Sequence, residues 1–395
     1  NDADLGRKRW LRRGLLMTAF GGAFLTWAGM AGRQYFRQYG RLATFSLVFI
    51  GLVTIYSVTS NGPESQFPIF AKQGIWIGVG ALAFVVVASM DYHKLARLSY
   101  ILYGLGLILL IIVMISGKTS RGAQRWISLG PVAIQPSEFI KLPLLLMLST
   151  YYATQTQRGW LYRVIVPGLL ALPGFLLILK QPDLGSSLSF LAIYITLLLA
   201  VGVKSKAFGL VLLTALMIFP FAWGGLWSSL HDYQKERIIS FVDPAYDPGG
   251  KGYQGLQSRI AVGSGEFLGK GLHGGTQTQF KFLPEGHTDF VFAVFAEEWG
   301  FLGAVVLIML FLTLFLLGLD IASKAKDMLG GLLAVGIVGM MMFNVVVNIG
   351  MTVGLAPIVG IPLPLLSYGG SATIVTMAAL GLLLSVKRHR LTLIQ

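Results

Sequence analysis

Charged and polar side chains gather in one short stretch of this sequence, directly before a long apolar run. The stretch reads PEGHTDF and places Glu285, His287 and Asp289 two residues apart. Carboxylates and imidazoles are common general acids and bases. Residues at this spacing share one side of an extended segment, so we expect the three side chains to face one cavity. Capping of the helix that follows would account for Asp289 alone.

Further polar residues stand at the start of other apolar runs. Glu138 and Lys141, in QPSEFIKL, are three residues apart and therefore share a helix face. A charge pair inside a membrane is costly, so it is either part of a functional site or a lock between helices. Asp183, in QPDLGSS, is expected to cap the helix that it precedes.

Two more carboxylates lie within the apolar run that follows PEGHTDF. Glu297 and Glu298 are about 12 to 13 Å further along that helix, which is close to the middle of a bilayer. We expect them to tie the helix to its neighbours and one of them to pair with a cation.

A metal site is a second use for clustered carboxylates and histidines. The chain lacks the H-E-x-x-H zinc signature, and its other histidines are scattered. No cofactor is certain, and the metal stays unknown. A divalent cation, magnesium or manganese, that binds together with a phosphate remains an open alternative.

The composition identifies a membrane protein. Hydrophobic residues make up 55% of the 395 residues and charged residues 12%, against roughly 25% charge in soluble domains. Apolar runs of about 17 to 23 residues, long enough to cross a bilayer, recur along the chain. We predict an all-α, polytopic integral membrane protein with ten spans. The predicted spans are 42–58, 69–90, 98–116, 136–152, 162–179, 185–203, 207–226, 289–318, 328–350 and 369–386.

The positive residues predict the orientation of these spans. Lysines and arginines cluster in short loops at alternate ends, as in the terminal Lys387–Arg390. The positive-inside rule then places both termini of the ten-span body in the cytoplasm. The orientation of the spans in the membrane explains most of the positive residues behind the net charge of +14. We therefore expect no nucleic-acid partner. The absence of cysteine excludes disulfides and thiolate metal sites.

Alternation of the spans sends four polar segments to the outer face: 117–135, 180–187, about 227–288, and 351–368. These segments are unusually basic. Their cations either anchor the protein to headgroups or form an external site for a phosphate-bearing ligand. The segment 227–288 is too long for a plain connection. It contains a predicted amphipathic helix that ends at Asp243, and then a glycine-dense stretch that is either a flexible surface loop or a backbone that approaches a ligand.

The first forty residues fit this plan less well. Gly14–Ala31 is apolar enough to span a membrane, yet basic residues flank it on both sides. We separate residues 1–40, as an extra helix, an interfacial segment or a foreign addition, from a transmembrane domain over residues 41–390.

Five segments, in order along the chain, resemble the SEDS family (shape, elongation, division and sporulation), and its rod-shape members more than its division members. They are Ser120–Gly130 (SRGAQRWISLG), Gln135–Leu142, Lys180–Leu188, Ser258–Gly303 and Gly360–Val386. The resemblance implies a ten-helix bundle and a peptidoglycan glycosyltransferase. It implies that the substrate is lipid II, polymerised at the outer face of the bacterial cytoplasmic membrane. The implied partners are a class B penicillin-binding protein and membrane lipid.

The resemblance also implies the site residues. Asp289 matches the family's essential aspartate, and we predict that it is the general base of an inverting transfer. Positive charge near the leaving diphosphate would come from Lys72, Arg125 and Lys141. Glu138 would orient Lys141, while Asp183, Glu285 and His287 would shape or charge the cavity.

Two other functions use the same residues. A flippase for lipid II would also need buried charges, but those charges would line a path into the cytoplasmic half of the bilayer. A scaffold for the penicillin-binding protein would leave the buried charges unexplained.

Overall fold

The apolar runs of the sequence form long helices. The computed structural model describes residues 36–60, 67–120, 123–129, 132–155, 159, 161–202, 232–243, 250–280, 282–283 and 285–390. The helices of the bundle are α2 (Phe36–Ser60), α3 (Phe67–Ser89), α4 (Tyr92–Arg97), α5 (Ser99–Ser116), α6 (Pro136–Phe139), α7 (Lys141–Thr154), α8 (Val166–Lys180, after a π-helical turn at Leu161–Ile165), α9 (Leu184–Ala200), α14 (Val291–Ser323), α15 (Met328–Thr352) and α16 (Gly370–Arg390).

Nine of the ten predicted spans coincide with these helices, and the tenth, 207–226, lies outside the described residues. Among the described residues, seven helices are long and apolar enough to cross a membrane. The span predicted at 136–152 is divided at Ile140 into α6 and α7. Helix α2 begins at Phe36 rather than near residue 41, while residues 1–35 lie outside the description.

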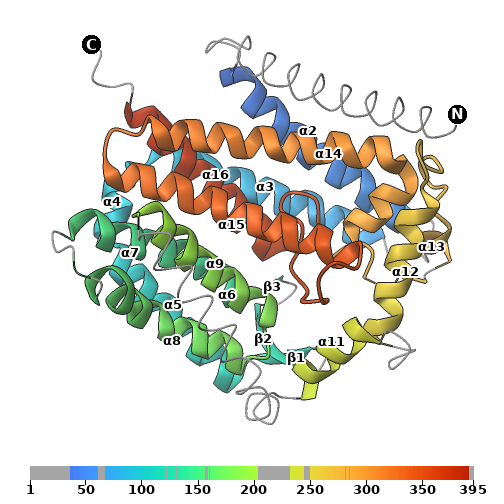
Figure 1. Ribbon diagram of the computed structural model, residues 1–395, viewed down its shortest axis with the longest axis horizontal. Helices are drawn as coiled ribbons and strands as arrows, with labels where there is room; N and C mark the ends of the chain where they lie inside the picture. The colour runs from blue at the N-terminus through green and yellow to red at the C-terminus, as the bar shows by residue number, and fades with distance from the viewer. Residues whose placement is uncertain are drawn as a thin grey trace, which may run out of the picture.

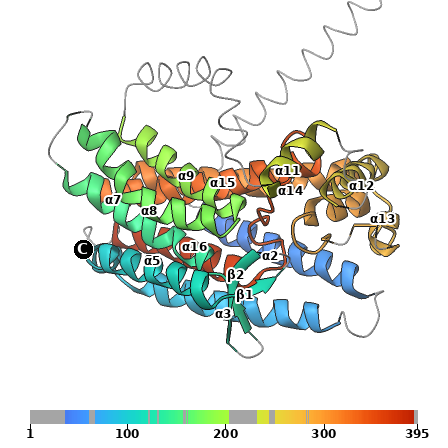
Figure 2. The same ribbon diagram turned by 90° about the horizontal axis from the view of Figure 1, so that it is seen from below.

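The helices alternate in direction, so the bundle has two opposite ends. Helices α3, α6, α9, α14 and α16 begin at one end, where α11 (Asp232–Val242), α12 (Lys251–Ser264) and α13 (Thr276–Gln279) also lie (Figure 1). We call this the loop end. At the other end, the tail end, α4 lies beside the start of α15 and the last turns of α16, on the opposite side of Figure 1 from α12 and α13. Figure 2 shows α7 toward the tail end and α12 and α13 at the loop end.

Apolar packing holds the helices together between these ends. One large cluster of buried side chains joins α5, α7, α9, α14, α15 and α16, and a smaller one at the loop end includes Phe290 and Ile361. Large apolar side chains also cover the outside of the bundle: Phe45 is 72% exposed and Ile115 is 78% exposed. Such a surface is stable only where lipid chains solvate it, which agrees with the predicted membrane location.

A small antiparallel sheet precedes α6 at the loop end. Strands β1 (Lys118–Ser120), β2 (Ala123–Leu129) and β3 (Val132–Ile134) pair in the order β1-β2-β3. The sequence predicted a polar connection here. The all-α prediction is confirmed by the described helices, apart from these three short strands. Three short strands carry too few residues for their alternation to stand out.

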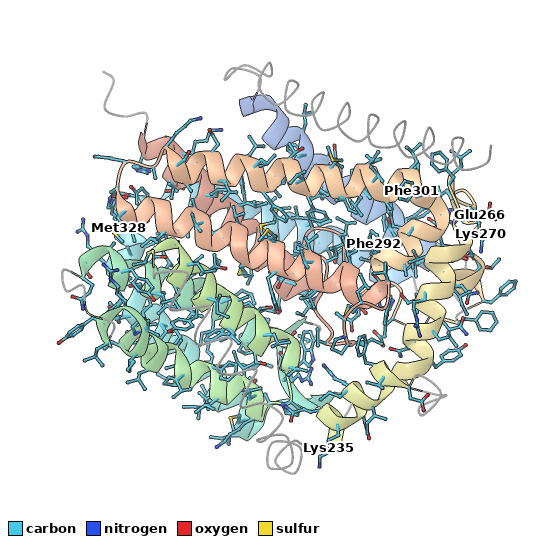
Figure 3. All side chains as sticks on the ribbon, in the orientation of Figure 1. Lys235, Glu266, Lys270, Phe292, Phe301 and Met328 are labelled. Atoms are coloured by element: carbon cyan, nitrogen blue, oxygen red, sulfur yellow. The ribbon has the colours of Figure 1, made fainter. Side chains whose placement is uncertain are left out.

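Helix α14 is interrupted at Gly300, whose φ of 64° and ψ of −164° are not helical. The loop after α12 lies against this break, and Figure 3 places Glu266 and Lys270 of that loop near Phe301. Four backbone hydrogen bonds join the two segments: Phe301 N to Glu266 O (2.9 Å), Leu302 N to Phe267 O (3.1 Å), Lys270 N to Glu297 O (3.0 Å) and Gly271 N to Glu298 O (2.9 Å).

Part of the glycine-dense stretch is therefore ordered by contact. Residues 251–264 form α12, and the residues after it are bonded to α14, so a flexible surface loop is the wrong description for these residues. The amphipathic helix predicted before it is confirmed as α11, which ends at Val242.

Candidate active site at the loop end

Asp289 lies in the turn before α14, beside a loop from a distant part of the chain. Helix α14 begins at Val291, and its N-cap residue, Phe290, makes no side-chain capping bond. Asp289 therefore stands one residue before the N-cap position that was expected for it. Its carboxylate faces Gly360, where an added Cβ would lie 3.3 Å from Asp289 Oδ2. The φ of Gly360 is 74°, a conformation that favours glycine.

The PEGHTDF stretch is a series of turns and not the extended segment that its spacing predicted. Phe290 N donates to Glu285 O at 3.2 Å. The buried Glu285 carboxylate accepts a hydrogen bond from Thr288 Oγ1 at 2.9 Å, within its own turn. The His287 ring lies 5.7 Å from the ring of Tyr368. The three predicted side chains thus have different neighbours.

The segment between α15 and α16, residues 353–369, holds this turn in place. We call it the return loop. Its Ser367 Oγ donates to Thr288 O at 2.6 Å, and its Tyr368 N donates to His287 O at 2.8 Å. Burial raises the pKa of the Tyr368 hydroxyl above its usual value, so this phenol stays neutral. The return loop therefore fixes the backbone on which Asp289 stands.

Helix α3 contacts the same loop. The buried Gln73 accepts a hydrogen bond from Gly369 N (3.3 Å) and donates to Ser367 O (3.5 Å). Lys72, the adjacent residue, is exposed near the start of α3. Lys72 is thus accessible at the outer edge of the loop end, which we call the rim.

A second group of charged residues is buried beneath the sheet. Lys141 Nζ lies 2.5 Å from Glu138 Oε1, and the two residues are 2% and 7% exposed. Ser186 Oγ of α9 donates to the same Glu138 oxygen at 3.3 Å. The predicted shared face is confirmed, but Lys141 is enclosed and already paired.

Asp183 joins this group from the start of α9. It is the N-cap of α9, as predicted, and accepts from Ser186 N at 3.2 Å. Ser137 Oγ and Gln135 Nε2 also donate to it, each at 2.8 Å. Burial opposes ionisation, but the positive charge of Arg125 and these hydrogen bonds outweigh it, so the pKa of Asp183 lies below its usual value.

Arg125 of β2 connects the sheet to this group. Its Nε donates to Gln181 O at 3.0 Å, its Nη2 donates to Pro182 O, and its Nη1 lies 3.9 Å from Asp183 Oδ1. The side chain is 23% exposed. The guanidinium therefore both anchors the sheet and presents part of its positive charge outward.

The return loop lies between Asp289 and this buried group. An added Cβ on Gly185, at the start of α9, would lie 3.0 Å from Val359 O and 3.2 Å from Gly360 O. On the far side of the same loop, Gly360 faces Asp289. Gln135 N, next to α6, donates to Ser371 Oγ of α16 at 3.0 Å. The structure thus brings together the predicted residues of α6, α7, α9 and the PEGHTDF turn, with Lys72 at the rim.

Glu297 and Glu298 fasten α14 to its neighbours, as predicted, but the cation comes from the loop. Lys270 Nζ lies 2.7 Å from Glu297 Oε1, and Glu297 is fully buried. Glu298 Oε1 accepts from Ser57 of α2 and, at 3.3 Å, from His273 N. Because both carboxylates are bonded to the loop after α12, they belong to the loop end.

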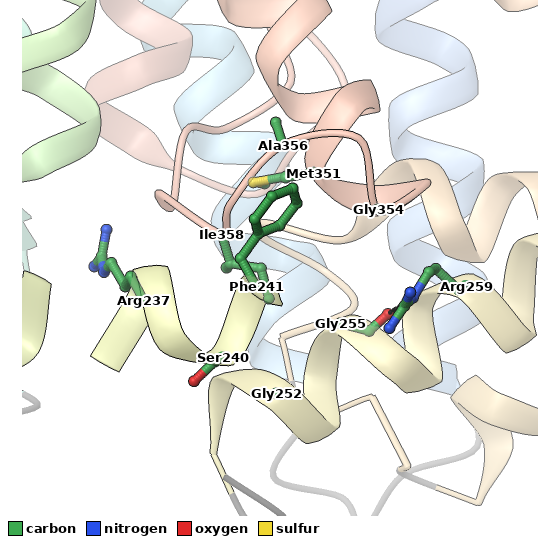
Figure 4. Close-up of a pocket in the computed structure, with 10 residues that line it drawn as sticks. All are labelled: Arg237, Ser240, Phe241, Gly252, Gly255, Arg259, Met351, Gly354, Ala356 and Ile358. Carbon is green, nitrogen blue, oxygen red and sulfur yellow. Dashed lines mark hydrogen bonds between the residues drawn. The ribbon is translucent and has the colours of Figure 1, made fainter. Parts of the chain in front are cut away.

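Two hollows adjoin the site. A small pocket lies between α11, α12 and the return loop, with Arg237 and Arg259 at opposite sides and Phe241 and Met351 between them (Figure 4). An apolar groove follows α5 and α16 and reaches α6. The groove is lined by Val87, Leu95, Leu102, Leu105, Gly106, Leu109, Pro136, Phe139, Ile140, Leu142, Pro143, Leu146, Ile374, Val375, Ala378 and Leu382.

The residues that the sequence reasoning missed are the polar supports of the turn. Gln73, Ser367 and Tyr368 have no special spacing, and only their contacts reveal the role. Asn348 of α15 is a further support, because its side chain bonds to two loop carbonyls. In the part of the chain that the structure describes, no group of three or more His, Asp or Glu residues is arranged to hold a metal ion.

Comparison with known proteins agrees with this arrangement. Residues 38–392 match the family model described as cell cycle protein, FtsW/RodA/SpoVE. The chain is 40% identical to peptidoglycan glycosyltransferase MrdB of Escherichia coli over 80% of this chain and 84% of the relative. It is 36% identical to stage V sporulation protein E of Bacillus subtilis over 88% of this chain and 96% of the relative.

Solved structures show the same fold. A structure described as "Structural coordination of polymerization and crosslinking by a peptidoglycan synthase complex" is similar with a TM-score of 0.76, 34% identity and coverage of 89% of this chain and 97% of that chain. The rod shape determining protein RodA of Thermus thermophilus gives a TM-score of 0.66 and 30% identity, over 89% of this chain and 96% of that chain. The chain therefore belongs to the SEDS family of integral membrane proteins, that of FtsW, RodA and SpoVE.

Proposed function

We propose that this peptidoglycan glycosyltransferase uses Asp289 as the general base that activates a sugar hydroxyl of lipid II. The observation that carries the proposal is the position of the carboxylate. It stands one residue before the N-cap of α14, it faces the return loop at Gly360, and it lies at the loop end, where the buried charged group is also found. A carboxylate on a turn that is held in place by hydrogen bonds, beside a loop, is suited to proton transfer.

The reaction is a single displacement. The 4-hydroxyl oxygen of one lipid-linked sugar attacks the anomeric carbon of another and forms the new glycosidic bond. The bond from that carbon to the diphosphate oxygen breaks, and the undecaprenyl diphosphate leaves with the electron pair. Asp289 takes the proton of the attacking hydroxyl. For this transfer its carboxylate has to come within about 2.6–3.2 Å of that hydroxyl in the complex with lipid II.

Cationic side chains offset the charge of the leaving diphosphate. Lys72 is exposed at the rim and Arg125 is partly exposed, so both are accessible to a phosphate oxygen. Lys141 is buried and paired with Glu138, and we therefore assign it a different role from the one first expected. It balances Glu138 and helps to keep Asp183 ionised. Glu285 and His287 support the turn before Asp289.

The apolar groove is suited to the polyprenyl chain of the substrate. Its wall includes Pro136, Phe139 and Ile140, the residues that flank Glu138 and Lys141. A lipid tail in this groove would bring its diphosphate toward the buried charged group. A divalent cation, magnesium or manganese, bound together with the diphosphate stays an alternative source of positive charge.

The loop end is proposed to face the outside of the bacterial cytoplasmic membrane, as the distribution of lysine and arginine indicates. The tail end and both ends of the ten-span body would then be cytoplasmic. The similar peptidoglycan synthase complex coordinates polymerisation with crosslinking. We infer that this chain likewise works with a crosslinking enzyme, a class B penicillin-binding protein.

The alternative of a lipid II flippase has less support. The buried charged residues of the described chain are Glu138, Lys141, Asp183, Glu285, Glu297 and Glu298. All six lie at the loop end, in or next to elements that begin there. Between the two ends the core is mainly apolar, whereas a transport path would need polar groups in both halves of the bilayer.

The test is polymerisation of lipid II by the purified protein. Asp289→Asn removes the base but keeps the size of the side chain, so the initial rate should fall by roughly 10²- to 10⁴-fold. Asp320→Asn, near the other end of α14, is the matched control, because Asp320 is far from the loop end and pairs with Lys324 in the neighbouring turn. Wild-type turnover in Asp289→Asn would exclude Asp289 as the base.

A further inference from the structure

Asn348 of α15 lies directly behind the backbone of Asp289. Its side chain is fully buried. The amide nitrogen Nδ2 donates to Asp289 O at 2.9 Å and to Ile361 O at 2.7 Å. Both carbonyls belong to segments outside the helices, one before α14 and one in the return loop. A single amide group therefore joins the turn that carries the carboxylate to the loop that the carboxylate faces.

The bonding pattern of this amide is one-sided. Both amide hydrogens are used, whereas the oxygen Oδ1 is buried without a partner among the described residues. Buried polar atoms are nearly always hydrogen-bonded, so a buried oxygen without a partner is unfavourable. An asparagine at this position therefore indicates that the two bonds donated by its nitrogen are what the position requires. Among side chains of this size, only an amide can donate two hydrogen bonds in this geometry.

One of the two carbonyls belongs to Asp289 itself, and the other belongs to the loop that its carboxylate faces. Asp289 Oδ2 faces Gly360, and Gly360 is the residue before Ile361. The amide thus fixes how far the Asp289 backbone lies from the loop that bounds its carboxylate. Because a misplacement of about 1 Å in a catalytic group costs roughly 10²-fold in rate, this separation is important for the reaction.

We propose that Asn348 is a positioning residue of the glycosyl transfer, which acts through Asp289 by setting the place of its carboxylate against the return loop. The inference rests on the proposed function of Asp289. It predicts that loss of the amide slows the chemical step and leaves the binding of lipid II nearly unchanged.

The chain offers a matched control one helical turn away. Asn344 is also buried on α15, but its Oδ1 accepts from Ser189 Oγ of α9 at 2.9 Å. Substitution of either asparagine removes a buried hydrogen-bonding group from the same helix. Only Asn348 is bonded to the turn that carries Asp289.

The experiment measures kcat and KM for lipid II polymerisation in Asn348→Ala, Asn348→Ser and Asn344→Ala, together with the melting temperature of each variant. In Asn348→Ala kcat should fall about 10- to 100-fold with KM within about twofold. Asn348→Ser keeps one donor and should lie between Ala and wild type. Asn344→Ala should keep kcat within about twofold despite a similar loss of stability.

A second measurement separates positioning from simple destabilisation. In an Asp289→Glu background the carboxylate is already displaced, so Asn348→Ala should reduce kcat by a much smaller factor than in the wild type. The proposal is overturned if Asn348→Ala and Asn344→Ala lower kcat equally, or if the effect of Asn348→Ala is the same in both backgrounds. Asp289→Asn, assayed in parallel, shows separately whether Asp289 itself is required. If Asn348→Ala does not fold, the order of wild type, Asn348→Ser and Asn344→Ala decides.

Discussion

The residues of the loop end divide into those that a substrate can reach and those that support them. Asp289, Lys72 and Arg125 are at least partly accessible, whereas Glu138, Lys141 and Asp183 are buried and bonded to one another. The sequence identified all six, but it did not separate the two groups. Spacing along a helix shows which residues share a face, and burial depends on what packs against that face.

The buried pair predicts a clear difference between single and double substitution. Lys141→Met leaves Glu138 buried without its partner, and the free energy of unfolding should fall by about 3–5 kcal/mol. The double variant Glu138→Gln with Lys141→Met removes both charges and should be much closer to the wild type. Thermal unfolding in detergent measures both. Equal destabilisation of the single and double variants would show that the charges are not coupled.

At the scale of elements, the break in α14 joins the long outer loop to the helix next to Asp289. The segment 291–299 lies between the Asp289 turn and Gly300, and it is bonded to the loop after α12. We therefore expect a shift of that loop to move the start of α14, next to Asp289.

Substitution of Gly300 tests this junction. In Gly300→Ala the new Cβ would lie 2.3 Å from Gly269 N at a φ of 64°. The backbone conformation of Gly300 is one that essentially only glycine adopts, and it costs about 1–3 kcal/mol for alanine. The loop should therefore detach, and trypsin should cut more rapidly after Lys270. Gly78→Ala on α3 is the control, because no atom lies within 4 Å of its added Cβ. Equal cleavage of the two variants would contradict the account.

Hydropathy predicts the elements well and their interruptions poorly. Nine spans coincide with the helices, since each apolar run has the length that a bilayer requires. The break at Gly300, the short sheet and the turns at 285–290 were missed. Each depends on contacts with distant segments, such as Ser367 with Thr288, and a local pattern carries no record of such contacts.

In the molecule as a whole, the two ends of the bundle carry different polar groups. The tail end has a cluster that joins α4, α15 and α16. His93 Nδ1 lies 2.9 Å from Asp91, and Nε2 lies 2.7 Å from Asp327. Tyr92 donates to Asp327 at 3.1 Å, and His389 Nε2 lies 3.9 Å from Asp91. Ion pairs and caps here fix the helix ends far from the site.

The tail-end cluster makes stability depend on pH. Burial lowers the pKa of His93, but its two carboxylate partners outweigh burial and raise it above 6.5, while the pKa values of Asp91 and Asp327 fall below 3.8. The two carboxylates contribute to the stability of the fold above pH 3.8, their ordinary pKa. The imidazolium contributes fully below pH 6.5, and its contribution is lost as the pH rises through the raised pKa. The melting-temperature difference between wild type and His93→Gln should therefore shrink from about pH 6 to pH 9. A constant difference would contradict this assignment.

The central claim is that Asp289 accepts the proton of the attacking hydroxyl. It is tested most directly by single-turnover transfer with saturating lipid II, with lipid II binding measured on the same preparation. In Asp289→Asn we predict that the chemical step slows by roughly 10²- to 10⁴-fold while the dissociation constant for lipid II stays within about twofold. An unchanged chemical step, or a loss of activity that weaker binding explains in full, would contradict the account.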